Sequence, residues 1–446
     1  MKVRSLRMGI IPQVVKAIQE VLEAGADKLA KTTGFVKRQV KVTGSNFSQM
    51  LVFGWLSNPD ATLEELTQMG AAVGLEITPQ GLDQRFTKEA SEFMKEILGK
   101  AIEQVVQAEP VAVPLLQKFN GVYLKDSTIV TLPDGLKDIW PGSGGGENTS
   151  GASLKIEVGI DMLCGKLLGP LLEAGKVTDR GSELHKIELP AGSLRIADLG
   201  YWSLNQLEEY SLADVFWLIR AQSQTAIFDT DGKRWELAAL AKTQKGDEID
   251  MQVTMGVKKG LSARLVGQRV PPSVAQERRR KLRKAANDEG KTPSQNSLTL
   301  CDWVLFVTNV PESMLSLPEV LVLARLRWQI ELLFKLWKDH GHLDMSNSAQ
   351  PYRILCECYA KLVAMVIQHW FLLTSSWRFP DRSFRKAAAA IRQHILHIAL
   401  AIPDSDALAS ALYILQRCLA HGCRINKSCQ TPRSFQLLLA AENPYP

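Results

Sequence analysis

Residues 327–338 read Arg-Trp-Gln-Ile-Glu-Leu-Leu-Phe-Lys-Leu-Trp-Lys. Each residue of an α-helix advances by about 100°, so Arg327, Glu331, Lys335 and Lys338 fall within roughly 80° of one another. The neighbouring sector is apolar, which predicts an amphipathic helix whose polar face carries one carboxylate among three cations. That face suits a metal ligand beside a phosphate backbone. A buried helix with a solvated basic edge would have the same pattern.

Two further acids follow short runs of β-forming residues. Asp126 follows Val-Tyr-Leu-Lys and Asp198 follows Leu-Arg-Ile-Ala, so both are predicted to stand where strands end. Carboxylates repel one another at contact distance, and divalent cations offset that repulsion. Oxygen ligands suit Mg²⁺ or Mn²⁺ better than zinc. Taken singly, either Asp could instead be a turn cap.

The spacing of Arg327, Glu331 and Lys338 resembles the Arg-Glu-Lys part of the Tyr-Arg-Glu-Lys signature. That signature belongs to the insertion-sequence-four family of DDE transposases, which are cut-and-paste bacterial transposases. The sequences Asp-Ser-Thr from residue 126 and Asp-Leu-Gly-Tyr from residue 198 are similar to the family's first and second Asp motifs. This chain has Ala324 where the signature has Tyr, a departure that affects one phosphate contact and not the catalytic carboxylate.

The resemblance implies an α/β fold with a ribonuclease-H-like catalytic core, an inserted β-rich domain, and flanking N- and C-terminal helical regions. The stretch between Asp198 and Glu331 is too long for a simple connection and rich in predicted strands, which fits such an insertion. The expected parts are a helical DNA-binding region at 1–110, the first part of the core at 111–202, the inserted domain at 203–316, the core helix at 317–345, and a helical, dimerising region at 346–446.

The resemblance also implies the site and its chemistry. Asp126, Asp198 and Glu331 would be the catalytic residues and the ligands of two Mg²⁺ ions, for which Mn²⁺ can substitute. Contacts with DNA are implied for five side chains: Arg220, Trp303, Arg327, Lys335 and Lys338. In relatives, the Trp stacks on a base flipped out during hairpin formation. A buried core tryptophan is nearly as good an interpretation of that strand-start residue.

The implied function is transposition of an insertion sequence. Water cleaves a phosphodiester at the transposon end, the freed 3′ hydroxyl forms a hairpin on the opposite strand, and the reopened ends join target DNA. The partners are double-stranded terminal inverted repeats and target DNA, held by a homodimer in a synaptic complex. Alternatives are a metal-dependent DNA nuclease without strand transfer and an inactive DNA-binding relative. A glycosidase explains neither the cationic helix face nor Arg220.

Composition agrees with this hypothesis without proving it. The chain has 446 residues and a formal net charge of +6, which is mildly basic and compatible with nucleic acid. The N-terminus lacks the apolar core of a secretory signal. Residues 355–377 form the most apolar long stretch, but they include Glu357 and Lys361 and are predicted to form a buried helix. With seven scattered cysteines, these features predict a bacterial cytoplasmic protein, nucleoid-associated when acting.

Local patterns outside the acids give further expectations. A capping pattern starts a helix at Thr62, and a second helix is predicted from Thr78, the outline of a helix-turn-helix that is equally common in proteins that never touch DNA. Residues 249–255 alternate between apolar and polar, which predicts a strand. The basic run at 278–284 is predicted to be a flexible arm or a short helix, and in a DNA enzyme it would contact phosphates.

Overall fold

The computed structural model describes residues 9–38, 41–144, 150–378, 382–425 and 438. They form a mixed α/β structure with a large sheet. The chain divides into two compact units. The first unit comprises Met1–Ala112, Ser127–Thr178 and Glu331–Thr431, and the second comprises Val113–Asp126, Asp179–Ile330 and Pro432–Pro446.

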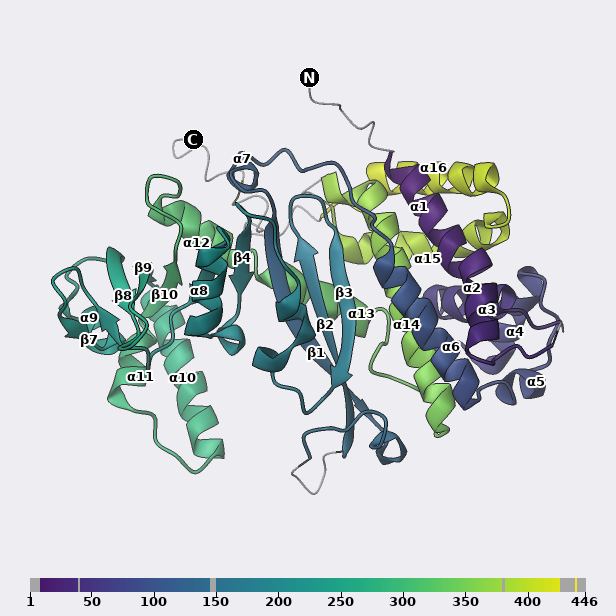
Figure 1. The fold of residues 1–446 in the computed structure, drawn as a ribbon, viewed down its shortest axis with the longest axis horizontal. Coiled ribbons are helices and arrows are strands. Elements are labelled where there is room, and N and C mark those ends of the chain that lie inside the picture. The colour runs from purple at the N-terminus through teal and green to yellow at the C-terminus, as the bar shows by residue number, and fades with distance from the viewer. Residues whose placement is uncertain (1–8, 39–40, 145–149, 379–381, 426–437, 439–446) are drawn as a thin grey trace. The chain divides into compact units, whose positions relative to one another are not determined.

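The first unit is mainly helical (Figure 1). Its helices are α1 (Ile10–Gln19), α2 (Gly25–Thr32), α3 (Gly44–Ser57), α4 (Leu63–Ala72), α5 (Pro79–Asp83), α6 (Lys88–Glu103), α14 (Pro351–Thr374), α15 (Phe384–Ala401) and α16 (Ser405–His421). The helical content predicted for residues 1–110 is therefore confirmed. Thr62 caps α4 through a reciprocal bond with Glu65, as its spacing predicts.

Helix α14 is the centre of the first unit. It packs against α3 and α6, and Figure 1 shows α6 running beside it. It is also the one helix of the described residues that is long and apolar enough to cross a membrane, yet its most apolar window is wholly buried inside the protein. The prediction of a buried helix over this stretch is confirmed, and the helix tolerates Glu357 and Lys361 because they pair with each other.

Strand β1 (Val122–Leu132) begins in the second unit and ends in the first. Within the first unit, β2 (Ala152–Asp161) pairs with β3 (Leu167–Ala174) in antiparallel fashion. The prediction that a strand ends at Asp126 is wrong, because β1 continues through it to Leu132. The following residues include Thr128, Ile129 and Val130, whose branched side chains favour extended backbone.

The strands of the second unit follow the order β1, β4 (Leu194–Ala197), β5 (Phe216–Arg220), β10 (Trp303–Thr308), β9 (Leu261–Arg269), β8 (Glu248–Met255), β6 (Ile227–Phe228) and β7 (Arg234–Trp235). Strands β1, β4 and β5 are parallel, whereas the others pair in antiparallel fashion. The strand predicted from the alternation at 249–255 is confirmed as β8. Its buried side chains include Ile249, Val253 and Met255, which join one core cluster.

The remaining helices are α7 (Pro114–Gln117), α8 (Leu204–Leu212), α9 (Leu237–Thr243), α10 (Pro272–Asp288), α11 (Gln295–Leu300), α12 (Leu317–Arg325) and α13 (Trp328–Asp339). The basic run at 278–284 lies inside α10, which has 17 residues, so neither a flexible arm nor a short helix is correct. Pro272 occupies its first turn, and its Ala, Arg and Lys residues are strong helix formers. The second helix predicted from Thr78 is α5, which Thr78 caps but which has only five residues before α6 begins at Lys88.

Candidate active site

The two aspartates occupy equivalent positions on neighbouring parallel strands. Lys125 of β1 is aligned with Ala197 of β4, and Ala197 with Ile219 of β5. The next residues along the three strands are Asp126, Asp198 and Arg220. Adjacent strands lie about 4.8 Å apart, and side chains in the same register point to the same face. The sheet therefore brings Asp126 and Asp198 together at the edge where the β1–β4 pairing ends.

The alternation of side chains along β1 separates two charged neighbours. Lys125 is completely buried, and its ammonium group donates a hydrogen bond to the carbonyl oxygen of Leu184 at 2.6 Å. Asp126 therefore points to the opposite face, where 21% of its side chain is exposed. The acid is therefore partly exposed to solvent, whereas the lysine stabilises the segment that contains Leu184.

Arg327 supplies positive charge to both aspartates. Its Nη1 atom lies 3.9 Å from Oδ2 of Asp126 and 3.8 Å from Oδ2 of Asp198. The helix predicted to begin before Arg327 is interrupted, because Leu326 and Arg327 form a turn between α12 and α13. The guanidinium group therefore approaches the acids from a turn between two helices, and it does not belong to the helix that carries Glu331.

The motif from Asp198 to Tyr201 forms a tight turn, and side chains from outside the motif pack against it. Asp198 precedes a 3₁₀ turn over Leu199–Tyr201. A Cβ on Gly200 would stand 2.8 Å from Oδ2 of Asp179, so a larger residue at this position would displace the Asp179 side chain. Tyr201 is buried, with the guanidinium of Arg195 5.8 Å from the centre of its ring. The glycine and the tyrosine of the motif therefore have structural reasons to follow the aspartate.

Arg195 is a buried residue that the sequence interpretation missed. Its side chain is 1% exposed, and its guanidinium lies 4.9 Å from the ring centre of Tyr210 in α8 as well as facing Tyr201. Burial lowers the pKa of Arg195 from its usual value. It joins strand β4, the turn after Asp198 and helix α8. In the sequence, Arg195 is a single Arg within an apolar strand. Nothing in that pattern indicates that its side chain contacts Tyr201 and Tyr210.

Glu331 lies in the first turn of α13, four residues after Arg327, and is half-buried. It belongs to the first unit, whereas the two aspartates belong to the second. Within the first unit, Lys338 donates a hydrogen bond to the carbonyl oxygen of Ile129 at 3.0 Å. Lys335 is largely exposed, 4.0 Å from Asp339. Among the described residues, no three His, Cys, Asp or Glu side chains are grouped closely enough to hold a metal ion.

Arg220 is exposed at the end of β5, where the strand register places it next to Asp198. Burial lowers the pKa of Arg278 in α10, and the positive charge of Arg220 lowers it further. Arg278 donates a hydrogen bond to the carbonyl oxygen of Trp303 at 3.1 Å. One guanidinium of the basic run at 278–284 thus lies close enough to Arg220 for their charges to interact. The spacing of the residues in the sequence does not reveal this.

Trp303 is only 2% exposed and belongs to the core of the second unit. The guanidinium of Arg269 lies over its ring, 4.6 Å from the centroid. These contacts are those of a core tryptophan, one of the two interpretations that the sequence left open. A DNA base could reach the ring only after Arg269 and its neighbours had moved.

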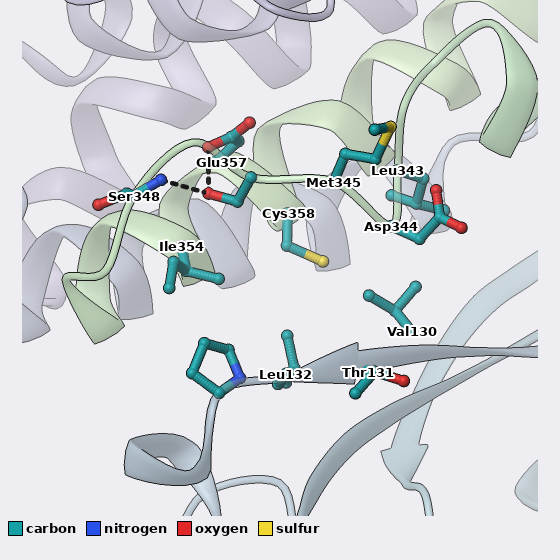
Figure 2. A pocket seen from close by; sticks show the side chains of 12 residues that line it. Val130, Thr131, Leu132, Leu343, Asp344, Met345, Ser348, Ile354, Glu357 and Cys358 are labelled. Carbon is teal, nitrogen blue, oxygen red and sulfur yellow. Dashed lines mark hydrogen bonds between the residues drawn. The ribbon is translucent and has the colours of Figure 1, made fainter. Parts of the chain in front are cut away.

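A cavity of about 340 Å³ lies within the first unit (Figure 2). Its wall includes Glu357, labelled in Figure 2, and Ser346, whose hydroxyl donates a hydrogen bond of 2.7 Å to the Glu357 carboxylate. Glu357 also pairs with Lys361 at 2.7 Å. The buried carboxylate of Glu357 in this wall therefore already has a hydroxyl donor and a cation as partners.

The chain matches known proteins over most of its length. Residues 117–367, more than half of the chain, match the family model described as a transposase DDE domain. The chain is 26% identical to the transposase for insertion sequence element IS231F of Bacillus thuringiensis subsp. israelensis, covering 92% of this chain and 91% of the relative.

Two further relatives extend the similarity. The transposase for insertion sequence element IS231B of Bacillus thuringiensis subsp. berliner is 28% identical, covering 76% of this chain and 75% of its own length. The transposase for insertion sequence element IS1151 of Clostridium perfringens is 25% identical, with coverage of 81% and 80%. The matched span includes Asp126, Asp198 and Glu331. The chain therefore belongs to the family of transposases with a DDE domain.

Proposed function

We propose that this protein is the DNA transposase of an insertion sequence, an enzyme that cleaves DNA at the ends of its element and joins those ends to target DNA. Family membership supports an enzyme acting on DNA. The observation that carries the proposal to particular residues is the pair of aspartates in equivalent positions on β1 and β4, with Arg327 within 4.0 Å of both.

Transposases with a DDE domain use divalent metal ions. We assign two Mg²⁺ ions, replaceable by Mn²⁺, to Asp126, Asp198 and Glu331. The donor chemistry suits such ions, because all three side chains offer carboxylate oxygens, but the described residues do not group three of them closely enough to hold one ion. When bound, the metals activate the attacking oxygen and stabilise the leaving oxygen of a phosphodiester. The chain's own part is to hold the carboxylates in register and to keep their edge of the sheet accessible.

The cationic side chains provide the DNA contacts of the proposal. Arg220, Arg327, Lys335 and Lys338 are assigned to phosphates near the aspartates, where each contact adds salt-sensitive affinity. Trp303 is retained as the base-stacking residue of a hairpin route, on condition that Arg269 leaves its ring. Ala324 removes one phosphate contact expected from the signature.

The finer assignment is to the insertion-sequence-four family, with its Tyr-Arg-Glu-Lys signature. In that assignment, a ribonuclease-H-like core carries the aspartates and residues 203–316 form the inserted domain. Residues 1–110 bind terminal inverted repeats, and residues 346–446 support a homodimer in the synaptic complex. The protein acts in the cytoplasm on nucleoid DNA. The parallel β1–β4–β5 arrangement, followed by antiparallel strands within 203–316, supports this assignment.

The test uses the full chain and a labelled DNA fragment that carries the element's terminal repeat. We expect cleavage at the repeat boundary with Mg²⁺, no cleavage with EDTA, and none with a Glu331→Gln variant. A matched Glu319→Gln variant removes an acid of α12 that caps its own helix instead, and it should retain cleavage.

The products separate the proposal from its rivals. Joining of the cut ends to a target plasmid supports a transposase, and a hairpin product supports the hairpin route. Cleavage without joining would favour a nuclease. Binding without cleavage, in both Mg²⁺ and Mn²⁺, would favour an inactive DNA-binding relative.

A further inference from the structure

Helix α10 has one face that is fixed to the second unit. Arg278 donates a hydrogen bond to the carbonyl oxygen of Trp303 at 3.1 Å, and Arg279 forms an ion pair with Asp302. Ala275, three and four residues before these arginines, lies on the same face and is buried. Two cations of the basic run at 278–284 therefore attach the helix to the start of β10 and its preceding residue.

The cations on the other side of α10 are exposed to solvent. The side chains of Arg280 and Lys281 are 70% and 73% exposed, and Arg283 and Lys284 are exposed as well. We call these four residues the outer cations. In the described part of the chain, the ion pairs of the outer cations involve one acid, Glu277, which lies 2.7 Å from Arg280 and 3.8 Å from Lys281. Positive charge therefore exceeds negative charge on this face.

This excess of positive charge is unfavourable for an isolated helix. Arg280 stands three residues before Arg283 and four before Lys284, so like charges are neighbours on the helix surface and repel one another. A helix face that is merely solvated more often alternates charges of both signs. The repulsion is relieved when an anion binds from outside, so the face favours a partner with closely spaced negative charges.

Duplex DNA fits this face in spacing and in chemistry. The stretch from Arg280 to Lys284 spans about 6 Å along the helix axis, and each DNA strand carries one phosphate per about 3.4 Å of duplex. The outer cations can therefore meet about two phosphates of one strand. Besides the outer cations, this stretch contains only Leu282, so it offers charged donors for phosphates and no amide side chain for reading a base edge. RNA also carries phosphates, but membership of the transposase family favours DNA.

We propose that the outer cations of α10 form a binding surface for the phosphates of duplex DNA, which adds affinity without selecting a sequence. This inference rests on the proposed function, because it takes DNA as the partner. Contacts with phosphates carry no direct sequence information, so the surface binds terminal repeats and target DNA alike. It lies in the compact unit that also contains Asp126 and Asp198.

The first measurement is binding of the full chain to two labelled duplexes, one with the terminal repeat and one of unrelated sequence. EDTA prevents cleavage, and the salt concentration is varied. The outer variant carries Arg280→Gln, Lys281→Gln, Arg283→Gln and Lys284→Gln, and Gln is as good a helix former as the residues it replaces. It should bind both duplexes about tenfold more weakly, and the slope of log affinity against log salt should become shallower by about two.

The matched control removes the same charge from scattered exposed positions of the same unit. It carries Arg234→Gln, Lys242→Gln, Lys245→Gln and Lys258→Gln. Its affinity should fall by less than about threefold, because salt screens charges that do not contact the DNA. Equal losses in the control and the outer variant would mean that only net charge matters, and would overturn the proposed surface.

A conservative variant tests whether the surface contacts phosphates or bases. Arg280→Lys with Arg283→Lys keeps every charge, and an ammonium group also binds phosphate. Affinity for both duplexes should stay within about twofold of the unmodified protein. A larger loss confined to the terminal repeat would show that the guanidinium groups read bases, which contradicts a surface without sequence selection.

Failure of this inference and failure of the proposed function give different results. If the unmodified protein binds neither duplex at any salt concentration, the proposed function is wrong and the inference falls with it. If it binds both but the outer variant binds equally well, the proposed function stands and the surface is wrong. A loss of affinity for an RNA duplex alone would assign the surface to RNA and also overturn the proposal. A circular dichroism spectrum confirms that each variant is folded.

Discussion

Two ion-paired regions of this molecule are built in opposite ways. In helix α14, Lys361 lies 2.7 Å from Glu357, and their side chains are 2% and 9% exposed. Lys361 also donates hydrogen bonds to the carbonyl oxygens of His342 and Met345, both at 2.9 Å. The aspartate pair of β1 and β4, by contrast, lies 3.9 and 3.8 Å from the guanidinium of Arg327 and is partly exposed.

The comparison shows how contact length and burial distinguish charged side chains that stabilise the fold from charged side chains that are available for chemistry. A buried pair is tolerated only when short contacts and further hydrogen bonds repay desolvation. Lys361 uses its bonds to fix the segment that follows α13. The two aspartates are partly exposed, so water screens their charges more than those of the buried pair. Substitutions of the aspartates should therefore lower DNA cleavage, whereas substitutions of the buried pair in α14 should lower the free energy of unfolding.

The largest expected effect is on catalysis at the aspartate edge. Asp198→Asn should reduce terminal-repeat cleavage by roughly a thousandfold, since metal-ion stabilisation of the transition state is worth several kcal/mol. Its free energy of unfolding should stay within about 1 kcal/mol of the unmodified protein, because the side chain is 48% exposed. Cleavage rates and urea unfolding measure the two effects. Near-normal cleavage by this variant would remove Asp198 from the site.

The second effect is on stability in α14. Lys361→Met leaves Glu357 buried without its cation and should lower the free energy of unfolding by about 3–5 kcal/mol. The double variant with Glu357→Met should recover most of that loss, because an apolar pair of similar volume needs no compensation. Lys335→Met, at an exposed pair 4.0 Å long, is the matched control and should cost less than about 0.5 kcal/mol. Equal losses from Lys361→Met and Lys335→Met would contradict the comparison.

A pH effect of intermediate size should arise from His369, also in α14. Its ring is buried and lies 2.7 Å from the carbonyl oxygen of Gly165, and burial lowers its pKa to about 4. The neutral ring is favoured by folding, so its contribution is complete above the unfolded pKa near 6.5 and is lost as the pH falls toward 4. Between pH 6.5 and 5 the loss should be about 2 kcal/mol.

Urea unfolding at several pH values measures this effect. The slope of stability with pH should be smaller in His369→Gln than in the unmodified protein. His397→Gln, at an exposed position of α15, should leave the slope unchanged. An unchanged slope in His369→Gln would mean that the buried imidazole is not the group responsible.

The smallest effect should come from Arg327. Without metal, Arg327→Gln should lower the free energy of unfolding by less than about 1 kcal/mol, because its side chain is 29% exposed and its contacts with the two aspartates are partly solvated. Added Mg²⁺ should cancel the loss, since the metal replaces the missing positive charge. A loss of 3 kcal/mol or more, on the scale expected of a buried pair, would place Arg327 with Lys361 as a structural residue.

Sequence patterns predicted which helices and strands form better than they predicted the residues at which these elements begin and end. Period-two alternation identified β8, and an apolar stretch with two opposite charges identified the buried α14. The strand end expected at Asp126 was wrong because β1 continues beyond it, and the helix expected from Arg327 starts after it. Hydrophobic patterns report which face is buried, whereas boundaries depend on local turns and on strand pairing that residue spacing does not encode.

The site was predictable only in part. Motif resemblance nominated Asp126 and Asp198, and the strand register brings them together. The interactions of the arginines in this part of the protein were not predictable from the sequence. Tertiary packing alone brings Arg195 to Tyr210 and lets the charges of Arg278 and Arg220 interact. Likewise, a tryptophan at a strand start can face DNA or the core, and only the packing around it distinguishes the two.

The central claim is that the metal ions are bound at Asp126, Asp198 and Glu331. Fe²⁺ substituted for Mg²⁺, with ascorbate and peroxide, generates hydroxyl radicals that cut the protein backbone near the bound metal. We predict cuts near residues 126, 198 and 331, suppressed by excess Mg²⁺ and absent in Asp198→Asn. Cuts at other positions, or the same cuts in the variant, would contradict the account.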